Sequence, residues 1–331
     1  MTRVKAFLRR AAYHCGLLPS LHRWRNSRHL TVLMFHRVLP ADSQAYRLAE
    51  REFTFTVDGF RDAMAFVKRH YSPVTLEQVR DHCSGRGPAL PPCPVLVTFD
   101  DGWLDTLEQA QPILAELGVP ATLFLATEAM ILPGGEWWQW RLTHLLASPG
   151  GLDELEARWG LSSPAGTPPG LRVHKLTAFV AGLPDEERRQ KLGSPEDASN
   201  PMMLDREGVK TLARSMSIAG HGHTHAPLSP FEKRHEDLAR SFAELASMNL
   251  SKYAMSFPHG SWNEHVWADA KAVGFEMCFS SAPHLVKLLG ANTGVKQPLG
   301  RIHVPENVWT CEDGRISPAK MASFLFFRAA Q

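Results

Sequence analysis

The strongest constraint on the fold is a set of continuous apolar runs of strand length, separated by segments of helical periodicity. The runs are LTVLMF at 30–35, PVLVTF at 94–99 and ATLFLA at 121–126. Uninterrupted apolar runs of this length are typical of strands that are buried on both faces, as in parallel sheets. A helical segment ending at Gly118 separates the second run from the third, which predicts a strand–helix–strand crossover.

The same alternation resumes at Leu204 and predicts an α/β fold. Two stretches lie outside it, namely a basic amphipathic arm at 1–30 and an insertion of helices and loop at about 134–203. A single α/β barrel routinely takes roughly 200–250 residues. We therefore expect residues 31–331 to form one barrel that carries the insertion.

Charge is distributed unevenly along the chain. The net charge is +2, but residues 1–41 contain eight Lys or Arg and no Asp or Glu, while the remainder has 28 basic and 34 acidic residues. A net charge so close to balance argues against a nucleic-acid partner. The apolar residues of a predicted helix over 4–18 share one face. This pattern fits docking on the protein's own domain or contact of residues 1–28 with an anionic membrane.

The cysteine pattern bears on the compartment. The five cysteines are scattered, odd in number and without a C-x-x-C pair, which favours a reducing environment. The apolar runs near the N-terminus are shorter than those of a signal peptide or a membrane span. We expect a cytoplasmic protein, with the inner face of the membrane as the candidate surface for residues 1–28.

Polar residues that could carry chemistry follow two of the predicted strands. Asp100 and Asp101 follow the run at 94–99, and a histidine triplet follows the strand MSIAG. Adjacent carboxylates repel each other unless one holds a cation or shares a proton. Taken alone, the Asp pair also fits a turn or a helix start, and the histidines a loop cluster.

The two motifs are more informative together, because the carboxyl ends of barrel strands meet at one face. A carboxylate and two imidazoles separated by four residues suit Zn²⁺ or a similar divalent ion. A second carboxylate could then take the proton of an attacking water. The combination predicts a hydrolytic centre.

These motifs resemble those of the polysaccharide deacetylases of NodB-homology type, carbohydrate esterase family 4, in the form used by the exopolysaccharide branch. The resemblance extends from about residue 31 to 305. It rests on TFDDGWLDTLEQAQPILAELGVPATLFL, IAGHGHTHAPLS and SFPHGSWNEHVWADAKAVGF. It implies an irregular (β/α) barrel and a hydrolase that removes N-acetyl groups from amino sugars of a polysaccharide or lipid-linked glycan, releasing acetate.

Residue roles follow from the resemblance at matching positions. It implies Asp100 as the catalytic base and Asp101, His221 and His225 as ligands of a divalent metal. Zinc is the first expectation, with cobalt, nickel or manganese as alternatives. The backbone N–H of His259 is the implied oxyanion donor, in a turn whose substrate-facing neighbours are Pro258 and Gly260. His223 matches no ligand.

The chain departs from the family pattern in three places. Gly222 stands where Ser or Thr is usual, so a hydrogen bond that steadies the loop is expected to be missing, and Ser256 stands where an Arg is common. The Leu-x-His motif that supplies a general acid is not evident, and His303 lies in a context that does not fit it. In the branch resembled, the acid is a histidine ending the first strand, which implies His36; the alternative is that His36 packs at the barrel rim.

Two further residues are candidate substrate contacts. Trp103 could stack on a sugar, and Arg301 could contact the substrate or orient Asp100. Two rival functions stay open. One is a metal-dependent hydrolase of a non-sugar amide, and the other is a non-catalytic glycan-binding protein built on the same fold.

Overall fold

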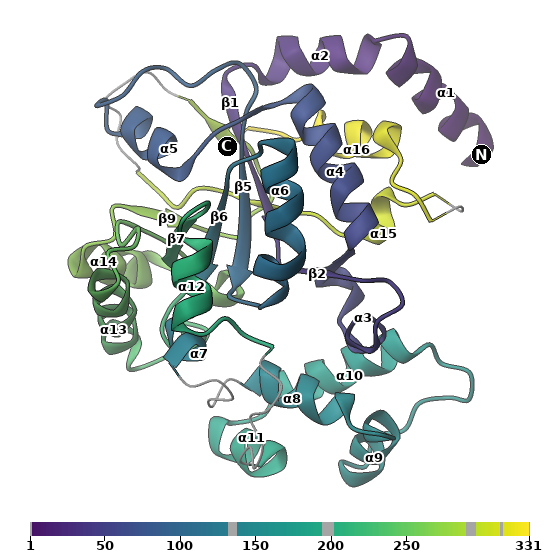
Figure 1. Cartoon of the computed structure of the whole chain (residues 1–331), viewed down its shortest axis with the longest axis vertical. Helices are drawn as coiled ribbons and strands as arrows, with labels where there is room; N and C mark the ends of the chain where they lie inside the picture. Colours follow the sequence, from purple (N-terminus) through teal and green to yellow (C-terminus); the bar gives the residue numbers. More distant parts are fainter. Residues whose placement is uncertain (1, 132–137, 194–201, 289–295, 312–313, 331) are drawn as a thin grey trace.

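A curled, mostly parallel sheet forms the centre of the molecule (Figure 1). The computed structural model describes residues 2–131, 138–193, 202–288, 296–311 and 314–330. The strand order is β10-β1-β5-β6-β7-β8-β9, with β4 beside β5 and β11 beside β1. The strands are β1 (His29–Phe35), β4 (Ser72–Pro73), β5 (Pro94–Asp101), β6 (Ala121–Leu125), β7 (Ser217–Gly220), β8 (Ala254–Ser256), β9 (Met277–Phe279), β10 (Val286–Lys287) and β11 (Ile302–His303).

The three apolar runs form the strands predicted from them. Every residue of β5 and of β6 is buried, which is why their sequences are mainly apolar rather than alternating between apolar and polar. Between them a π-helical turn (Thr106–Ala110) leads into α6 (Gln111–Leu117). The helix ends at Gly118, whose φ of 63° is left-handed and therefore favours glycine. The predicted strand–helix–strand crossover is confirmed.

The segment 299–303 closes the sheet into an irregular barrel. Leu299 bridges Phe279 on β9, and β11 pairs in parallel with β1, where His303 lies opposite Met34. One short segment therefore lies between the last and first strands of the parallel array. The predicted fold class, an irregular (β/α) barrel, is confirmed.

Helices and short connections surround the sheet. The largest apolar cluster contains Phe35, Phe60, Phe99 and Trp309, all almost inaccessible to solvent. The elements outside the sheet are β2 (Arg37–Leu39), α3 (Gln44–Leu48), a 3-10 turn (Arg51–Phe53), β3 (Thr54–Thr56), α4 (Val57–His70), α5 (Leu76–Cys83), α7 (Thr127–Ile131), α12 (Arg206–Leu212), α13 (Arg234–Ser247), α14 (Glu264–Val273), α15 (Glu306–Trp309) and α16 (Pro318–Leu325).

The basic arm consists of two helices, α1 (Thr2–His14) and α2 (Leu17–Asn26). The prediction of a single helix over 4–18 is wrong, because Gly16 lies between the two helices with a left-handed φ of 84°. The arm docks on its own domain. The Tyr13 hydroxyl lies 2.8 Å from His70 Nε2, and the buried His22 ring stacks on Phe326 at 4.2 Å.

The described residues of the insertion form four helices with an apolar cluster of their own. They are α8 (Trp138–Ala147), α9 (Gly151–Arg158), α10 (Pro169–Ala181) and α11 (Asp185–Leu192). Leu142, Leu155 and Leu176 are among the residues at the centre of that cluster. The predicted loop is found between α9 and α10, whereas 134–137 and 194–201 lie outside the described residues. Figure 1 shows these helices beyond the carboxyl ends of the strands.

The predicted domain division, with an arm at 1–30 and a barrel at 31–331 that carries the insertion, stays a prediction. Over the part of the chain that the structure describes, no helix has both the length and the apolar character needed to cross a membrane.

Candidate metal centre and active site

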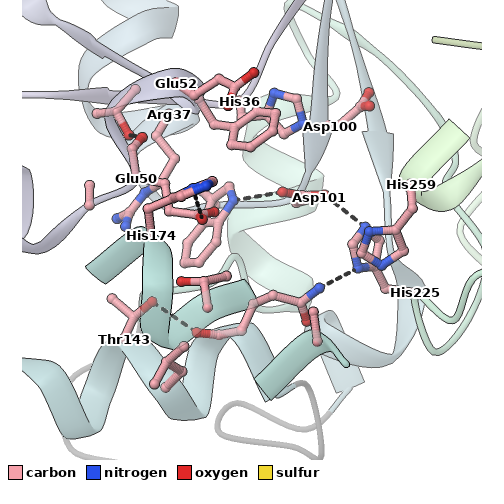
Figure 2. A pocket seen from close by; sticks show the side chains of 18 of the residues that line it. His36, Arg37, Glu50, Glu52, Asp100, Asp101, Thr143, His174, His225 and His259 are labelled. Carbon is pink, nitrogen blue, oxygen red and sulfur yellow. Dashed lines mark hydrogen bonds and ion pairs between the residues drawn. The ribbon is translucent and has the colours of Figure 1, made fainter. Parts of the chain in front are cut away.

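A cavity of about 530 Å³ lies at the carboxyl ends of the strands, between the barrel and the insertion. Asp100, Asp101, His221 and His225 line it from the barrel. Side chains of α8 and α10 line it from the insertion, and Figure 2 shows the cavity from close by. The two motifs predicted to act together therefore do meet in one cavity.

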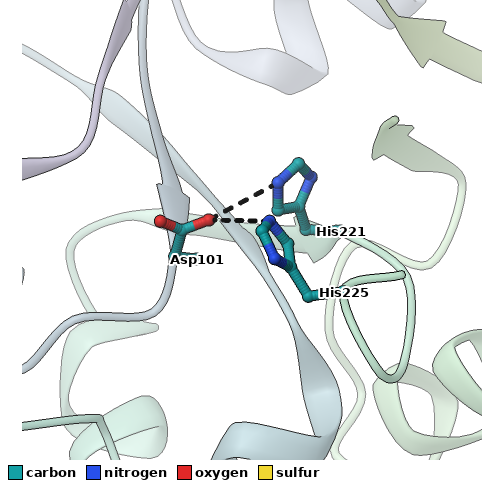
Figure 3. A group of neighbouring side chains, drawn as sticks. All are labelled: Asp101, His221 and His225. Atoms are coloured by element: carbon teal, nitrogen blue, oxygen red, sulfur yellow. Dashed lines mark ion pairs between the residues drawn. The ribbon is translucent and has the colours of Figure 1, made fainter. Parts of the chain in front are cut away.

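Three potential ligand atoms converge at the ends of β5 and β7 (Figure 3). Asp101 Oδ1 lies 3.5 Å from His221 Nε2 and 3.2 Å from His225 Nε2, and the three side chains offer ligand atoms that all lie within 4.8 Å of one another. Asp101 and His225 have left-handed φ angles of 82° and 60°. Such angles cost a non-glycine residue about 1–3 kcal/mol and are concentrated at functional sites.

A hydrogen bond to β8 sets the protonation of His221. Its Nδ1 lies 3.0 Å from the carbonyl oxygen of Ser256 and 2.6 Å from the hydroxyl of the same residue. Because a carbonyl oxygen only accepts, Nδ1 carries the hydrogen and Nε2 directs its lone pair towards Asp101. Ser256, at the position where the family commonly has Arg, thus anchors a candidate ligand.

The donor set fits a divalent cation. Asp101 Oδ1 is buried and has no hydrogen-bond partner among the described residues, while Oδ2 accepts from the Trp103 indole N–H at 2.9 Å. Burial raises the pKa of Asp101. His225 and the other nearby histidines lower this pKa by more than burial raises it, so the net shift is downward. Burial lowers the pKa of His221 to about 4. An ionised carboxylate and the neutral imidazole of His221 are therefore available as ligands at neutral pH, and the His225 ring lies beside them.

Asp100 is held by Arg301 in a two-pronged ion pair. Arg301 Nη1 and Nη2 donate to the two carboxylate oxygens at 2.6 and 2.8 Å, and Nε donates to the carbonyl of Ser280 at 3.1 Å. Burial raises the pKa of Asp100, but Arg301 and then His221 outweigh it and lower the pKa overall. Asp100 is thus ionised and fixed in orientation. The ion pair fits the second of the two roles expected for Arg301, orienting Asp100, and both roles stay predictions.

The turn expected to bind the oxyanion adjoins the same centre. It is a 3-10 turn (Pro258–Gly260), in which His259 has a left-handed φ of 54°. The His259 ring lies 4.5 Å from that of His225, and burial followed by the charge of His225 lowers its pKa to about 3. Gly260 has a φ of 63°, and a Cβ there would overlap the Ser281 hydroxyl. Only glycine fits this position without a local shift.

His36 and His303 line the cavity on the side of Asp100. His36 follows β1, contacts Phe53 with ring centroids 4.8 Å apart, and has a buried Nδ1 without a hydrogen-bond partner among the described residues. Figure 2 shows it next to Asp100. His303, which the sequence reasoning did not select, lies 6.2 Å from His36 between ring centroids. The alternation Arg301-Ile302-His303 was the available signal, since residues two apart on a strand share a face.

Trp103 is largely enclosed. Its indole N–H binds Asp101, and the Arg37 guanidinium lies 4.1 Å from its ring centroid. Arg37 is paired in turn with Asp105 at 3.0 Å. Trp103 borders the cavity with 6% of its surface exposed, and its stacking on a sugar stays a prediction.

The histidine loop is steadied by a residue outside the sequence motif. Asp237 on α13 accepts hydrogen bonds from the backbone N–H groups of His223 and Thr224 at 2.8 and 2.9 Å. Gly222 has a φ of 71°, and a Cβ there would lie 3.0 Å from Asp237 Oδ2. The hydrogen bond of the usual Ser or Thr side chain is absent at Gly222 as expected, and Asp237 supports the loop instead. His223 hydrogen-bonds Thr127 at 2.9 Å and does not join the ligand cluster.

The insertion also reaches the candidate ligands. Gln139 Nε2 on α8 lies 2.9 Å from His225 Nδ1. Glu50 and His174 line the same cavity, with Glu50 Oε1 3.7 Å from His174 Nδ1. Sequence reasoning missed all three, because no local motif marks them and their proximity depends on how the insertion folds over the barrel.

Comparison with known proteins gives one sequence match and several structural ones. Residues 88–141 match the sequence profile of the polysaccharide deacetylase family. A search of curated protein sequences finds no match.

Several solved structures share the fold. Deacetylase PplD of Streptococcus pyogenes has a TM-score of 0.57 at 16% identity, over 89% of this chain and 97% of that one. IcaB from Ammonifex degensii has a TM-score of 0.54 at 19% identity, over 90% and 97% of the two chains. The BpsB deacetylase domain from Bordetella bronchiseptica has a TM-score of 0.51 at 16% identity, over 83% and 96%.

The family profile covers the segment with Asp100 and Asp101, and the structural likeness extends to most of the chain. The expected resemblance and enzyme class are confirmed. The roles of the individual site residues stay predictions. Residues 88–141 thus match the polysaccharide deacetylase family, and the fold of most of the chain is similar to that of deacetylases of known structure.

Proposed function

We propose that this protein is a divalent-metal-dependent hydrolase that removes N-acetyl groups from amino sugars of a polysaccharide or lipid-linked glycan. The observation that carries the proposal is the convergence of Asp101, His221 and His225 within 4.8 Å beside the ionised Asp100. The structural neighbour from S. pyogenes is a deacetylase in complex with acetate, the product expected here.

Asp101, His221 and His225 would hold the metal, with zinc as the first candidate by its preference for this donor set. When bound, such an ion supplies Lewis acidity towards a carbonyl and lowers the pKa of water. The protein's own contribution is to keep both Nδ1 atoms engaged, so that the Nε2 atoms face the carboxylate.

Asp100 is the proposed general base. Its carboxylate accepts the proton of the attacking water, while Arg301 holds both oxygens in place and keeps the group ionised. The backbone N–H of His259 donates to the oxyanion that forms at the former carbonyl. These groups stand on strands and on a tight turn, so that little reorganisation is needed.

His36 is the proposed general acid. Cleavage of the C–N bond requires protonation of the departing amine, because an unprotonated amide nitrogen is a poor leaving group. His303 is the nearest rival, but burial followed by the charge of His36 lowers its pKa to about 4. His303 is then neutral near pH 7. The products are acetate and a free amino sugar.

The cavity sets the scale of substrate that can be enclosed. Its volume of about 530 Å³ lies within the range of sites that enclose a small molecule. We therefore expect a short stretch of glycan around the acetamido group to enter, with the insertion as its outer wall.

The direct experiment is acetate release from N-acetylglucosamine oligomers before and after treatment with a strong chelator. We expect loss of activity on chelation and recovery on adding zinc, cobalt, nickel or manganese. Activity that is indifferent to chelation, or unchanged in Asp100→Asn, would disprove the proposed mechanism.

A cytoplasmic location is also proposed. It is supported by the cysteines, all five of which are free thiols in the structure. Thiol labelling of the protein in intact and permeabilised cells checks this. Labelling of exposed Cys15 in intact cells by an impermeant reagent would contradict it.

A further inference from the structure

The outer face of the arm carries an unusual share of exposed apolar surface. Of the eight large hydrophobic residues exposed in the described parts of the chain, five lie on α1 and α2: Val4, Phe7, Leu8, Leu17 and Trp24. They are 58–80% exposed. Tyr13, Leu18 and His22 point inward and dock the arm. One face of these helices thus packs on the domain while another presents apolar side chains to solvent.

Exposed basic residues lie on the same two helices and directly after them. Lys5, Arg10, Arg23, Arg25 and Arg28 are exposed, and the first acidic residue of the chain is Asp42. An amphipathic helix with basic flanks and aromatic or leucine side chains on its apolar face is typical of peripheral membrane binding. Anionic lipid would complement the charge and receive the apolar side chains.

We propose that the outer face of α1 and α2 binds an anionic membrane surface. A second copy of the chain is the less suitable occupant, because a twofold interface places the same patch against itself. That arrangement would oppose one cluster of arginines with another. An anionic bilayer satisfies both the apolar and the basic residues.

This mode of binding sets the orientation of the active site. The arm leads directly into the start of β1, whereas the site lies where the strands end. The seven residues of β1 span about 23 Å at about 3.3 Å per residue. Figure 1 shows the arm and the insertion at opposite ends of the molecule. The bound enzyme would therefore turn its cavity away from the lipid, towards glycan that extends from the surface.

Vesicle co-sedimentation of the full-length protein tests the proposal. Vesicles of phosphatidylcholine with phosphatidylglycerol are compared with vesicles of phosphatidylcholine alone. Three variants are used: Phe7→Ser with Leu8→Ser, Arg23→Gln with Arg25→Gln, and Leu171→Ser as a control on the insertion. Leu171 is 62% exposed, the same as Leu17, so the control removes equivalent apolar surface elsewhere.

Wild type and Leu171→Ser should pellet with the anionic vesicles only. The Phe7/Leu8 variant should remain in the supernatant, and the Arg23/Arg25 variant should bind roughly 25-fold more weakly, at about fivefold per basic residue. All variants should release acetate from soluble substrate at the wild-type rate. Equal pelleting with both vesicle types, or by the Phe7/Leu8 variant, would overturn the proposal. So would a dimer in sedimentation analysis that the same variant dissociates.

A second inference concerns Gln139 and rests on the proposed metal site. As placed, its Nε2 faces His225 Nδ1 at 2.9 Å, while its Oε1 is buried without a hydrogen-bond partner among the described residues. The two ends of an amide have nearly the same shape, so their assignment depends on the hydrogen bonds they make. With the amide turned over, Oε1 accepts the Nδ1–H of His225.

We infer that Gln139 is a positioning residue for His225. Accepting the Nδ1–H leaves Nε2 with a lone pair directed at Asp101, as Ser256 does for His221. The first turn of α8 would thus link the insertion directly to the metal centre. The polar contact also gives the half-buried Gln139 side chain a partner on the barrel.

Zinc affinity, measured by competition with a chromogenic chelator, tests this inference independently of activity. Gln139→Leu should weaken zinc binding about 10–100-fold, the usual effect of losing a partner of a ligand histidine. Gln139→Glu should restore it, because a carboxylate also accepts the Nδ1–H. Thr143→Val, one turn along the same helix, should bind zinc like wild type, since the Thr143 hydroxyl donates to the backbone carbonyl of Gln139 and not to its side chain.

The outcomes separate the two hypotheses. Wild-type affinity in Gln139→Leu, with normal zinc binding by the parent protein, would overturn the role of Gln139 alone. Failure of the parent protein to bind any divalent metal would overturn the proposed function together with this inference.

Discussion

Breaking the ion pair between Arg301 and Asp100 should destabilise the fold more than removing both charges together. The side chains are 1% and 3% exposed, and the pair has two hydrogen bonds of 2.6 and 2.8 Å. Arg301→Met leaves the Asp100 carboxylate buried without its two donors. Removing one partner of such a pair typically costs about 3–5 kcal/mol of unfolding free energy.

The size of the expected thermal shift follows from chain length. An unfolding entropy of about 2.1 cal/mol/K per residue gives about 0.7 kcal/mol/K for the 331 residues. Arg301→Met should therefore lower the melting temperature by about 4–7 °C. In the double variant with Asp100→Asn, neither a carboxylate nor an unpaired charge remains buried at this pair. Its loss of unfolding free energy should therefore be smaller than the sum of the two single losses by about 2–3 kcal/mol.

Urea denaturation followed by tryptophan fluorescence measures these differences for the parent, both single variants and the double variant. The samples contain excess chelator, so that metal bound by the neighbouring Asp101 does not contribute to stability. Additive losses, within about 0.5 kcal/mol, would refute the coupling between these side chains. A loss below about 1 kcal/mol in Arg301→Met would show that the carboxylate does not depend on this partner.

Three other outcomes are expected. Asp101→Ala should lose both zinc binding and acetate release, whereas Asp100→Asn should keep most of its zinc by competition titration; equal zinc loss in both would contradict the separate roles. Burial lowers the pKa of His22 from 6.5 to about 4, so the unfolded chain takes up a proton at a higher pH than the folded one. The contribution of neutral His22 to the unfolding free energy should thus be fully present above pH 6.5 and decline by up to about 3 kcal/mol towards pH 4. A His22→Gln variant whose urea midpoint falls with decreasing pH as steeply as that of wild type would contradict this. Gly260→Ala should lower kcat and stability, the latter by about 1–3 kcal/mol, because its φ of 63° and the Ser281 hydroxyl leave no room for a Cβ; unchanged acetate release would show that the turn tolerates the shift.

Local patterns were enough to predict the main parallel strands and the two motifs that follow them. Strands β5 and β6 are buried on both faces, so apart from a threonine in each and the Asp pair that ends β5 they are apolar, and that run is visible without any tertiary information. Asp100 and Asp101 follow such a run directly. His221 and His225 likewise follow β7 within five residues, so local geometry alone brings them to the strand-end face.

Local patterns do not predict the supports of the site, and Arg301 was a candidate only through the resemblance to the deacetylase family. Arg301 meets Asp100 from 201 residues away, and Ser256 meets His221 from 35. These contacts depend on how β11 closes the barrel and on how β8 pairs with β7. Gln139 depends on how the insertion folds over the strand ends, 86 residues from His225.

The sequence by itself therefore determined the strand pattern, the order of the motifs and the chemical type of the site, because each depends on residues close together in the chain. The tertiary structure decided which side chains hold the base and the candidate ligands in place, and which face of the arm remains exposed. Those properties depend on packing between distant segments. No local periodicity encodes them.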